Sequence, residues 1–396
     1  MLSTPSQRLH YLDWIRVLAV FGVFLFHALH AFDAIPWVIK NEEVSFAITG
    51  TLMLFFPWGL PLFFMVAGAS TYFALQKRTD GQYVSERLGR LLLPFIVGSL
   101  LLSPVQAYVV ALHQGTFDGP FLAYLVTLPE RLVLLASPKM FSIWGWHLWF
   151  LGYLFAFALV TLPLFRYLGR QPSPVVERLA AFVARQRGGL LVLLLPLWAV
   201  RVGLHGIAPL EHGWTDFLYY LLFYVYGYVF FSDERFLQAV RRDWPIGLLV
   251  GLVGVVTIGV GSTTGFIGDD AWEPINGYTA ASVTLNAAMP IAALCWGTAV
   301  LALAQWRFNF SNALLRYGQR AIVPFYVLHQ PIILVLLYFI VDWSASLNVK
   351  VWVNVGASLL ITLLIYELAV RRLNPLRRAF GMKTAGSASV AMKGAS

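Results

Sequence analysis

Residues 14–27 read Trp-Ile-Arg-Val-Leu-Ala-Val-Phe-Gly-Val-Phe-Leu-Phe-His, an apolar stretch with two ionisable side chains, Arg16 and His27. In an α-helix, a spacing of eleven residues turns these side chains to within about 20° of one face and separates them by about 16 Å. Placing an ionisable group inside a bilayer costs on the order of 3 kcal/mol, so such groups usually serve a function. The stretch therefore predicts a membrane-spanning helix that aligns a cation near one surface with a titratable base near the bilayer centre.

The composition extends this prediction to the whole chain. Of its 396 residues, 59% are hydrophobic and 12% are charged, compared with about 25% charged in soluble proteins. Long apolar runs favour an all-α, polytopic membrane protein over a β-barrel, which needs short alternating segments. The first run lacks a small-residue cleavage site, so we expect a retained span. We expect one transmembrane domain over residues 1–383 and a disordered tail over 384–396, which is small and polar.

About ten segments are long and apolar enough to span a bilayer. They cover residues 14–32, 50–75, 91–112, 147–165, 190–207, 215–231, 245–262, 279–304, 321–341 and 351–370. The second segment is the least regular because Pro57 and Pro61 interrupt it. A short membrane-dipping piece followed by a helix from about residue 60 is one interpretation.

The distribution of basic residues predicts the orientation. Of the 28 lysines and arginines, Arg16 and Arg201 fall inside predicted spans, and only Lys40, Arg131, Lys139 and Lys350 fall on one of the two sides. The remainder lie on the other side, which the positive-inside rule places in the cytoplasm together with both termini. The net charge of +9 is thus explained by topology. Since no basic soluble domain is present, we expect no nucleic-acid partner.

Further candidate residues lie at the ends of spans or inside them. Arg87 and Arg90 precede the third span at a spacing of three, which suits a clamp for phosphates, although ordinary positive-inside charge explains them as well. His147 and Trp149 at the end of the fourth span could bind a polar ligand and stack on a ring, or could form an interfacial aromatic belt.

Two spans carry deeper ionisable groups. Arg201 needs an anionic partner, either in the protein or on a ligand. His329 precedes Pro331, which frees a backbone carbonyl, and this histidine could also serve only local hydrogen bonds. No Gly-x-Ser-x-Gly, P-loop or His-Glu-x-x-His pattern occurs, so hydrolase, ATPase and zinc-protease functions lack support and no metal site is expected.

These motifs together resemble the acyltransferase-3 family of integral membrane acyltransferases. The first span is similar to its Arg-x10-His motif, Arg87-Leu-Gly-Arg90 to its Arg-x-x-Arg motif, and His147-Leu-Trp-Phe-Leu and Tyr326-Val-Leu-His329-Gln-Pro to two later signatures. Residues 61–68 resemble its Phe-x-x-Ser-Gly segment, but Ala67 stands where serine is common, so a serine-dependent role there lacks support. The resemblance covers nearly the whole chain. It is strongest to the glucan biosynthesis protein C branch, through Asp13-Trp-x-Arg, Lys40-Asn41 and Ser103-Pro-Val-Gln106.

The resemblance implies a ten-helix core in the plasma (inner) membrane and transfer of an acyl group, acetyl or succinyl, from cytoplasmic acyl-CoA to a carbohydrate hydroxyl. We expect Arg87, Arg90 and Arg16 to bind the donor phosphates. His27 and Arg16, aligned on one helix face, are the expected catalytic residues, with His27 kept neutral by burial and acting as the base.

We expect His147, Trp149, Arg201 and His329 to contact substrate. The partners are then acyl-CoA, a carbohydrate acceptor and the lipid bilayer. A transporter or flippase of a glycan or lipid-linked sugar is the alternative, and the sequence leaves the acceptor, the acyl chain and the oligomeric state open.

Overall fold

The structure is a computed structural model that describes residues 9–131, 136–170, 173–208, 210–268 and 277–384. Within these ranges every regular element is a helix. The elements are α1 (His10–Leu29), α2 (Phe46–Leu75), α3 (Asp80–Arg87), η1 (Leu88–Leu92), α4 (Leu93–Leu101), α5 (Ser103–His113), α6 (Phe121–Arg131), α7 (Met140–Gly145), η2 (Trp146–Leu148), α8 (Trp149–Val160), α9 (Leu162–Arg170), α10 (Pro174–Arg185), η3 (Gly189–Leu193), α11 (Leu194–His205), α12 (Trp214–Ser232), α13 (Glu234–Thr263), α15 (Ala280–Arg307), α16 (Ala313–Ile340), α17 (Leu347–Ile365), η4 (Tyr366–Val370) and α18 (Asn374–Ala379). The predicted all-α class is confirmed. Most of the predicted tail, residues 385–396, lies outside the described residues.

Several helices begin where the sequence supplies a capping side chain. Thr79 and Gln82 form a reciprocal capping box at the start of α3, and Asp233 and Thr279 accept hydrogen bonds from the first turns of α13 and α15. These side chains satisfy backbone N–H groups that have no partner inside the helix.

Eight helical segments in the described part of the chain are long and apolar enough to cross a membrane. They are His10–Leu29, Phe46–Leu75, Asp80–His113, Met140–Val160, Glu234–Thr263, Ala280–Arg307, Ala313–Ile340 and Leu347–Val370. The other two predicted spans are also helical, but Gly189–His205 is shorter and α12 is rich in tyrosine and begins near Asp216. The chain is a multi-pass membrane protein, and the count of ten stays a prediction.

The second span differs from the interpretation that its prolines suggested. Helix α2 runs without a break from Phe46 to Leu75 and contains both Pro57 and Pro61. A proline removes one helical hydrogen bond, and membrane helices tolerate this when neighbouring groups satisfy the freed carbonyl. The prediction of a separate dipping piece before residue 60 was wrong.

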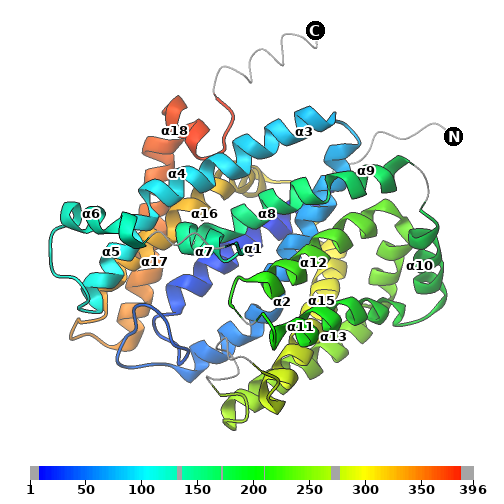
Figure 1. Cartoon of the computed structure of the whole chain (residues 1–396), viewed down its shortest axis with the longest axis horizontal. Helices are drawn as coiled ribbons and strands as arrows, with labels where there is room; N and C mark the ends of the chain where they lie inside the picture. The colour runs from blue at the N-terminus through cyan, green and yellow to red at the C-terminus, as the bar shows by residue number, and fades with distance from the viewer. Residues whose placement is uncertain (1–8, 132–135, 171–172, 209, 269–276, 385–396) are drawn as a thin grey trace. The chain divides into compact units, whose positions relative to one another are not determined.

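The chain divides into two compact units that interleave along the sequence. The first unit comprises the described residues within 1–21, 53–78 and 160–319. In it, α13 and α15 pack along each other, and α11 lies against α15 and α12 (Figure 1). Leu285, Ala288 and Met289 of α15 form a buried cluster with Ile258 and Ile267. Helix α15 is thus the central helix of this group.

Two glycines allow α2 and α12 to cross closely within the first unit. A Cβ atom at Gly68 would lie 1.8 Å from the carbonyl oxygen of Tyr224, and a Cβ atom at Gly227 would lie 1.8 Å from that of Met65. Small residues at such crossings let two membrane helices bring their backbones together. This crossing gives a structural reason for the glycine at the end of the residue 61–68 motif.

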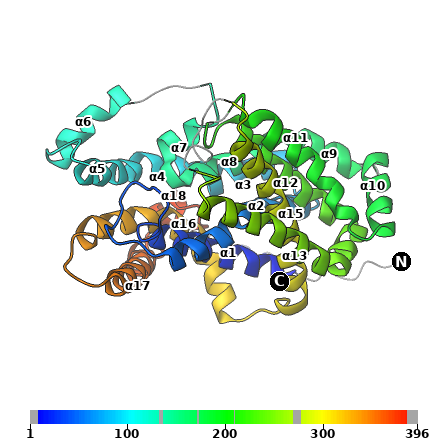
Figure 2. The same cartoon turned by 90° about the horizontal axis from the view of Figure 1, so that it is seen from below.

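The second unit comprises the described residues within 22–52, 79–159 and 320–396. Here α5 is followed by α6, which packs beside it (Figure 2). The ring of Phe24 in α1 contacts Phe325 in α16 at 5.5 Å, and the Asn354 amide in α17 donates to the Ala28 carbonyl over 2.8 Å. These contacts place the second half of α1 against α16 and α17.

Candidate functional site

Three histidines from distant parts of the sequence meet in the second unit and form what we call the histidine cluster: His27 of α1, His147 of η2 and His329 of α16. The Nδ1 atom of His27 lies 3.0 Å from the Nε2 atom of His329. The ring centroids are 5.2 Å apart for His27 and His329, 5.1 Å for His147 and His329, and 6.3 Å for His27 and His147. One motif in the first span and two later motifs therefore contribute to a single site.

Tyr326 holds two of these rings through its backbone. Its carbonyl oxygen lies 2.7 Å from His329 Nδ1 and 3.1 Å from His147 Nε2, and its hydroxyl donates to the His147 carbonyl. The His147 ring also lies close to the backbone of Val327. Val327 is the residue whose carbonyl loses its helical donor to Pro331, so the proline leaves this carbonyl available to a side chain.

The three histidines differ in accessibility. His329 is 0% exposed and His147 is 6% exposed, whereas His27 is only partly buried. The indole ring of Trp37 stacks on His27 at 6.4 Å and lies 5.1 Å from the ring of His30. His27 is thus the least buried member of the histidine cluster, and it lies beside an aromatic ring.

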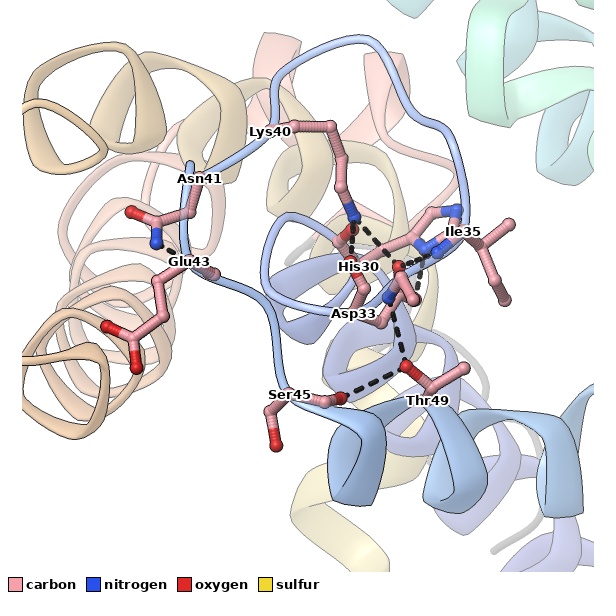
Figure 3. A network of polar contacts seen from close by, with 9 residues as sticks. His30, Asp33, Ile35, Lys40, Asn41, Glu43, Ser45 and Thr49 are labelled. Carbon is pink, nitrogen blue, oxygen red and sulfur yellow. Dashed lines mark hydrogen bonds and ion pairs between the residues drawn. The ribbon is translucent and has the colours of Figure 1, made fainter. Parts of the chain in front are cut away.

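The segment that carries Trp37 is fixed by a polar network around Asp33, which Figure 3 shows. The fully buried Asp33 carboxylate contacts His30 Nδ1 at 2.6 Å and Lys40 Nζ at 2.8 Å, and accepts from the Ile35 N–H at 2.9 Å. Lys40 also donates to the His30 carbonyl at 2.8 Å. A charged residue at each side of Trp37 therefore anchors the loop to the end of α1.

Arg16 lies on the same uninterrupted helix as His27 but belongs to the first unit. Its guanidinium contacts the Asp13 carboxylate at 3.0 Å and donates to the hydroxyl of Ser70. Ser70 follows Ala67 by one helical turn in α2. A hydroxyl is therefore present near the position where the family motif commonly has serine, and its oxygen accepts from Arg16.

Arg87 and Arg90 stand where the helix changes type. Arg87 ends α3, and the π-helix η1 covers Arg90; π-helical turns often occur at functional sites. The Arg87 guanidinium lies 4.7 Å from the centre of the Tyr83 ring. Arg90 pairs with Glu86 at 3.2 Å, and its side chain is 47% exposed. Both guanidiniums are held by neighbours one helical turn away.

The C-terminal part of the second unit approaches this turn. Gly381 has φ +72°, and a Cβ atom there would lie 3.1 Å from the Arg90 carbonyl oxygen and 3.0 Å from Pro94. The N–H groups of Gly381 and Met382 donate to the carbonyls of Arg378 and Arg377. This is the Schellman pattern that ends a helix with a left-handed residue.

The other two predicted site residues, Trp149 and Arg201, are packed against side chains of the protein itself. Trp149 is 8% exposed and its ring packs at 5.0 Å from that of Tyr153. Arg201 forms an ion pair with Asp216 of α12 within the first unit. The anionic partner predicted for Arg201 is therefore present in the protein itself. Their roles in substrate binding stay predictions. Among the described residues, no group of three or more His, Cys, Asp or Glu could hold a metal ion.

Sequence reasoning missed three parts of the site: Trp37, the carbonyl of Tyr326 and the π-helix at Arg90. Pro331 indicated a free backbone carbonyl, but that carbonyl belongs to Val327, and the sequence did not single out the carbonyl of Tyr326. Trp37 lies in a mixed polar and aromatic segment that gave no comparable signal, because its contact with His27 depends on how the loop folds back.

The chain is similar to known proteins over nearly its whole length. Residues 9–367 match the family described as "Acyltransferase domain". Proteins named "Glucans biosynthesis protein C" from Salmonella paratyphi A, Salmonella agona and Salmonella dublin are each 22% identical over 388 residues, which cover 94% of this chain and 94% of each relative. No solved structure matches the chain. With the family match extending over nearly all of its helices, the chain belongs to the acyltransferase-3 family and is a membrane O-acyltransferase.

Proposed function

We propose that this protein transfers an acetyl or succinyl group from cytoplasmic acyl-CoA to a hydroxyl of a glycan, in the plasma (inner) membrane. The glycan acceptor is supported by the name of the relatives, which refers to glucan biosynthesis. The observation that carries the proposal is the histidine cluster, in which His27 of the family motif is partly exposed and hydrogen-bonds His329.

In this proposal Arg87 and Arg90 bind the phosphates of the donor, with Arg16 as a further candidate. Guanidinium groups suit this task because each can donate two parallel hydrogen bonds to phosphate oxygens. Both Arg87 and Arg90 already contact aromatic or acidic neighbours. A phosphate would therefore compete with Glu86 for Arg90.

The chemical step needs one base. The acceptor oxygen attacks the thioester carbonyl carbon while His27 takes the hydroxyl proton, so a C–O bond forms and the C–S bond breaks. The sulfur leaves as a thiolate and receives the proton from His27, which returns the imidazole to its neutral form. A second route first places the acyl group on His27 and then transfers it to the acceptor. Ping-pong kinetics would favour that route.

The first prediction tests the base. We expect His27→Ala to lower acyl transfer by at least about 100-fold, the lower limit for a general base, while the protein still inserts into the membrane. Mass spectrometry of envelope glycans from cells with and without each variant measures the transfer. His113→Ala, at the end of α5, is the matched control. Full acylation with His27→Ala would contradict the assignment, and gradient-driven movement of a glycan without donor would instead indicate a transporter.

The second prediction tests donor binding. We expect Arg87→Ala and Arg90→Ala each to raise the KM for acyl-CoA by about tenfold, because each removes one charged hydrogen-bonding group worth about 1.5 kcal/mol. Initial rates in membrane vesicles measure this. Arg178→Ala in α10 removes an exposed arginine of the same predicted side as the control. If all three variants change KM alike, general surface charge explains the effect and the clamp is wrong.

A further inference from the structure

The backbone of α16 fixes the position of the proton on His329. The Nδ1 atom of His329 lies 2.7 Å from the carbonyl oxygen of Tyr326, and a carbonyl oxygen can only accept a hydrogen bond. Nδ1 must therefore carry the proton. In a neutral imidazole the other nitrogen is then a bare acceptor, so His329 Nε2 offers a lone pair.

That lone pair fixes the proton on His27 in turn. The Nδ1 atom of His27 lies 3.0 Å from His329 Nε2 and must donate to it. The backbone of Val23, one turn earlier in α1, also lies close to the His27 ring. The Nε2 atom of His27 is then the unprotonated nitrogen, which is the form that a base requires.

We infer that His329 is a positioning residue that holds His27 in the tautomer with Nε2 free to take the acceptor proton. This inference rests on the proposed function, in which His27 is the base. After the proton moves to Nε2, the charged ring still donates Nδ1–H to His329, so the same contact orients the ring before and after transfer. In a hydrolase triad, a carboxylate orients the catalytic histidine. Here the neutral imidazole of His329, itself held by a backbone carbonyl, takes the place of that carboxylate.

His147 does not perform this task, although it shares the same carbonyl. It donates from Nε2 to Tyr326, and its Nδ1 atom is buried without a hydrogen-bond partner. Among the contacts of the described residues, only His329 places a bare nitrogen within hydrogen-bonding distance of His27. Two hydrogen bonds therefore run in one direction: His27 donates to His329, and His329 donates to the Tyr326 carbonyl.

A kinetic test separates positioning from packing. His329→Leu removes the acceptor but keeps an apolar side chain, and His329→Gln retains an amide oxygen that can accept from His27. We expect His329→Leu to lower kcat by about 10- to 100-fold, the range found when partners that orient metal-binding histidines are removed. KM for donor and acceptor should stay unchanged, because the fully buried His329 ring bonds protein atoms through both nitrogens and leaves none for the substrate contact that the sequence predicted. We expect His329→Gln to recover most of this loss. Equal losses in both variants, or no loss in either, would overturn the inference.

A spectroscopic test needs no activity. Nitrogen NMR of wild-type protein labelled with [15N]histidine in lipid nanodiscs distinguishes protonated from bare ring nitrogens, and the His27→Asn spectrum identifies the His27 signals. We expect His27 to be protonated at Nδ1 and bare at Nε2; the opposite tautomer would overturn the inference. A wild-type protein that shows the expected tautomer but transfers no acyl group would refute the proposed function alone.

Discussion

Asp33 carries a buried charge that its neighbours hold in place. Burial acts to raise the pKa of its carboxyl group, but hydrogen bonds and charges from His30 and Lys40 outweigh this effect, and the pKa lies below its ordinary value. An acid whose pKa is lower in the folded protein stabilises the fold fully above its unfolded pKa, about 4 for aspartate. It loses that contribution as the pH falls toward the folded pKa.

We expect Asp33→Asn to lower the free energy of unfolding by about 1–3 kcal/mol at neutral pH, because Lys40 and His30 lose their anionic partner. The difference from wild type should shrink as the pH falls below about 4. Thermal unfolding in detergent across this range measures it. Asp118→Asn, which alters an exposed aspartate, should change little. A difference that stays constant into acid would show that the Asp33 charge is not what stabilises the loop.

At the residue scale, the sequence predicts which residues belong to the site better than it predicts which of them contact one another. Ionisable groups in apolar runs are conspicuous, and His27, His147 and His329 were all predicted as site residues for that reason. Their meeting depends on how α1, η2 and α16 pack, which residue patterns do not encode directly. Arg201 shows the same limit, since the need for an anion was predictable but the identity of Asp216 was not.

At the scale of elements, the crossing of α2 and α12 is the most sensitive contact to substitution. We expect Gly227→Ala to lower the free energy of unfolding by at least about 1–3 kcal/mol. The added methyl group would overlap the Met65 carbonyl, and backbone atoms cannot move aside without disturbing the helix. Thermal unfolding and the yield of folded protein in membranes measure the change.

The matched control is Gly259→Ala in α13, where an added Cβ would meet nothing within 4 Å. Alanine is favoured over glycine inside a helix by about 1 kcal/mol, so this variant should be neutral or more stable. If both variants behave alike, close approach of α2 and α12 is not what requires glycine at position 227.

Helix positions were predictable from hydropathy, and helix interruptions were not. The predicted spans all fall on helices, with ends that differ by several residues. Pro57 and Pro61 leave α2 continuous, whereas the third span is divided at Leu102 between α4 and α5. A proline signals a missing hydrogen bond, but neighbouring side chains and backbones decide whether the helix continues.

At the scale of the whole molecule, orientation is the property to test. The distribution of arginine and lysine predicts that Asp118 faces outward and Arg178 faces the cytoplasm. Both residues are exposed, and the single cysteine, Cys295, is buried. We expect a membrane-impermeant maleimide to label Asp118→Cys on intact cells and Arg178→Cys only after permeabilisation. The reverse labelling pattern would show that the predicted orientation is wrong, and with it the proposal that the acyl donor enters from the side of Arg178.

Composition was enough to predict a polytopic helical protein, because few other folds accommodate so many long apolar runs. It was not enough to count the spans, since α12, which carries several tyrosines and Asp216, is not among the eight segments that are long and apolar enough to cross a membrane. The single transmembrane domain over residues 1–383 stays a prediction, and the structure divides the chain into two compact units that interleave along the sequence. Interleaving of this kind arises from long-range packing and leaves no local pattern in the sequence.

The turn at Gly381 has a consequence for any shortened form of the protein. Because this glycine packs against the backbone of Arg90, residues that follow the last span support a turn nearly 300 positions earlier in the chain. A truncation after Leu373 would keep every apolar helix and still remove that support. Affinity tags are therefore better joined beyond residue 384 than in place of α18.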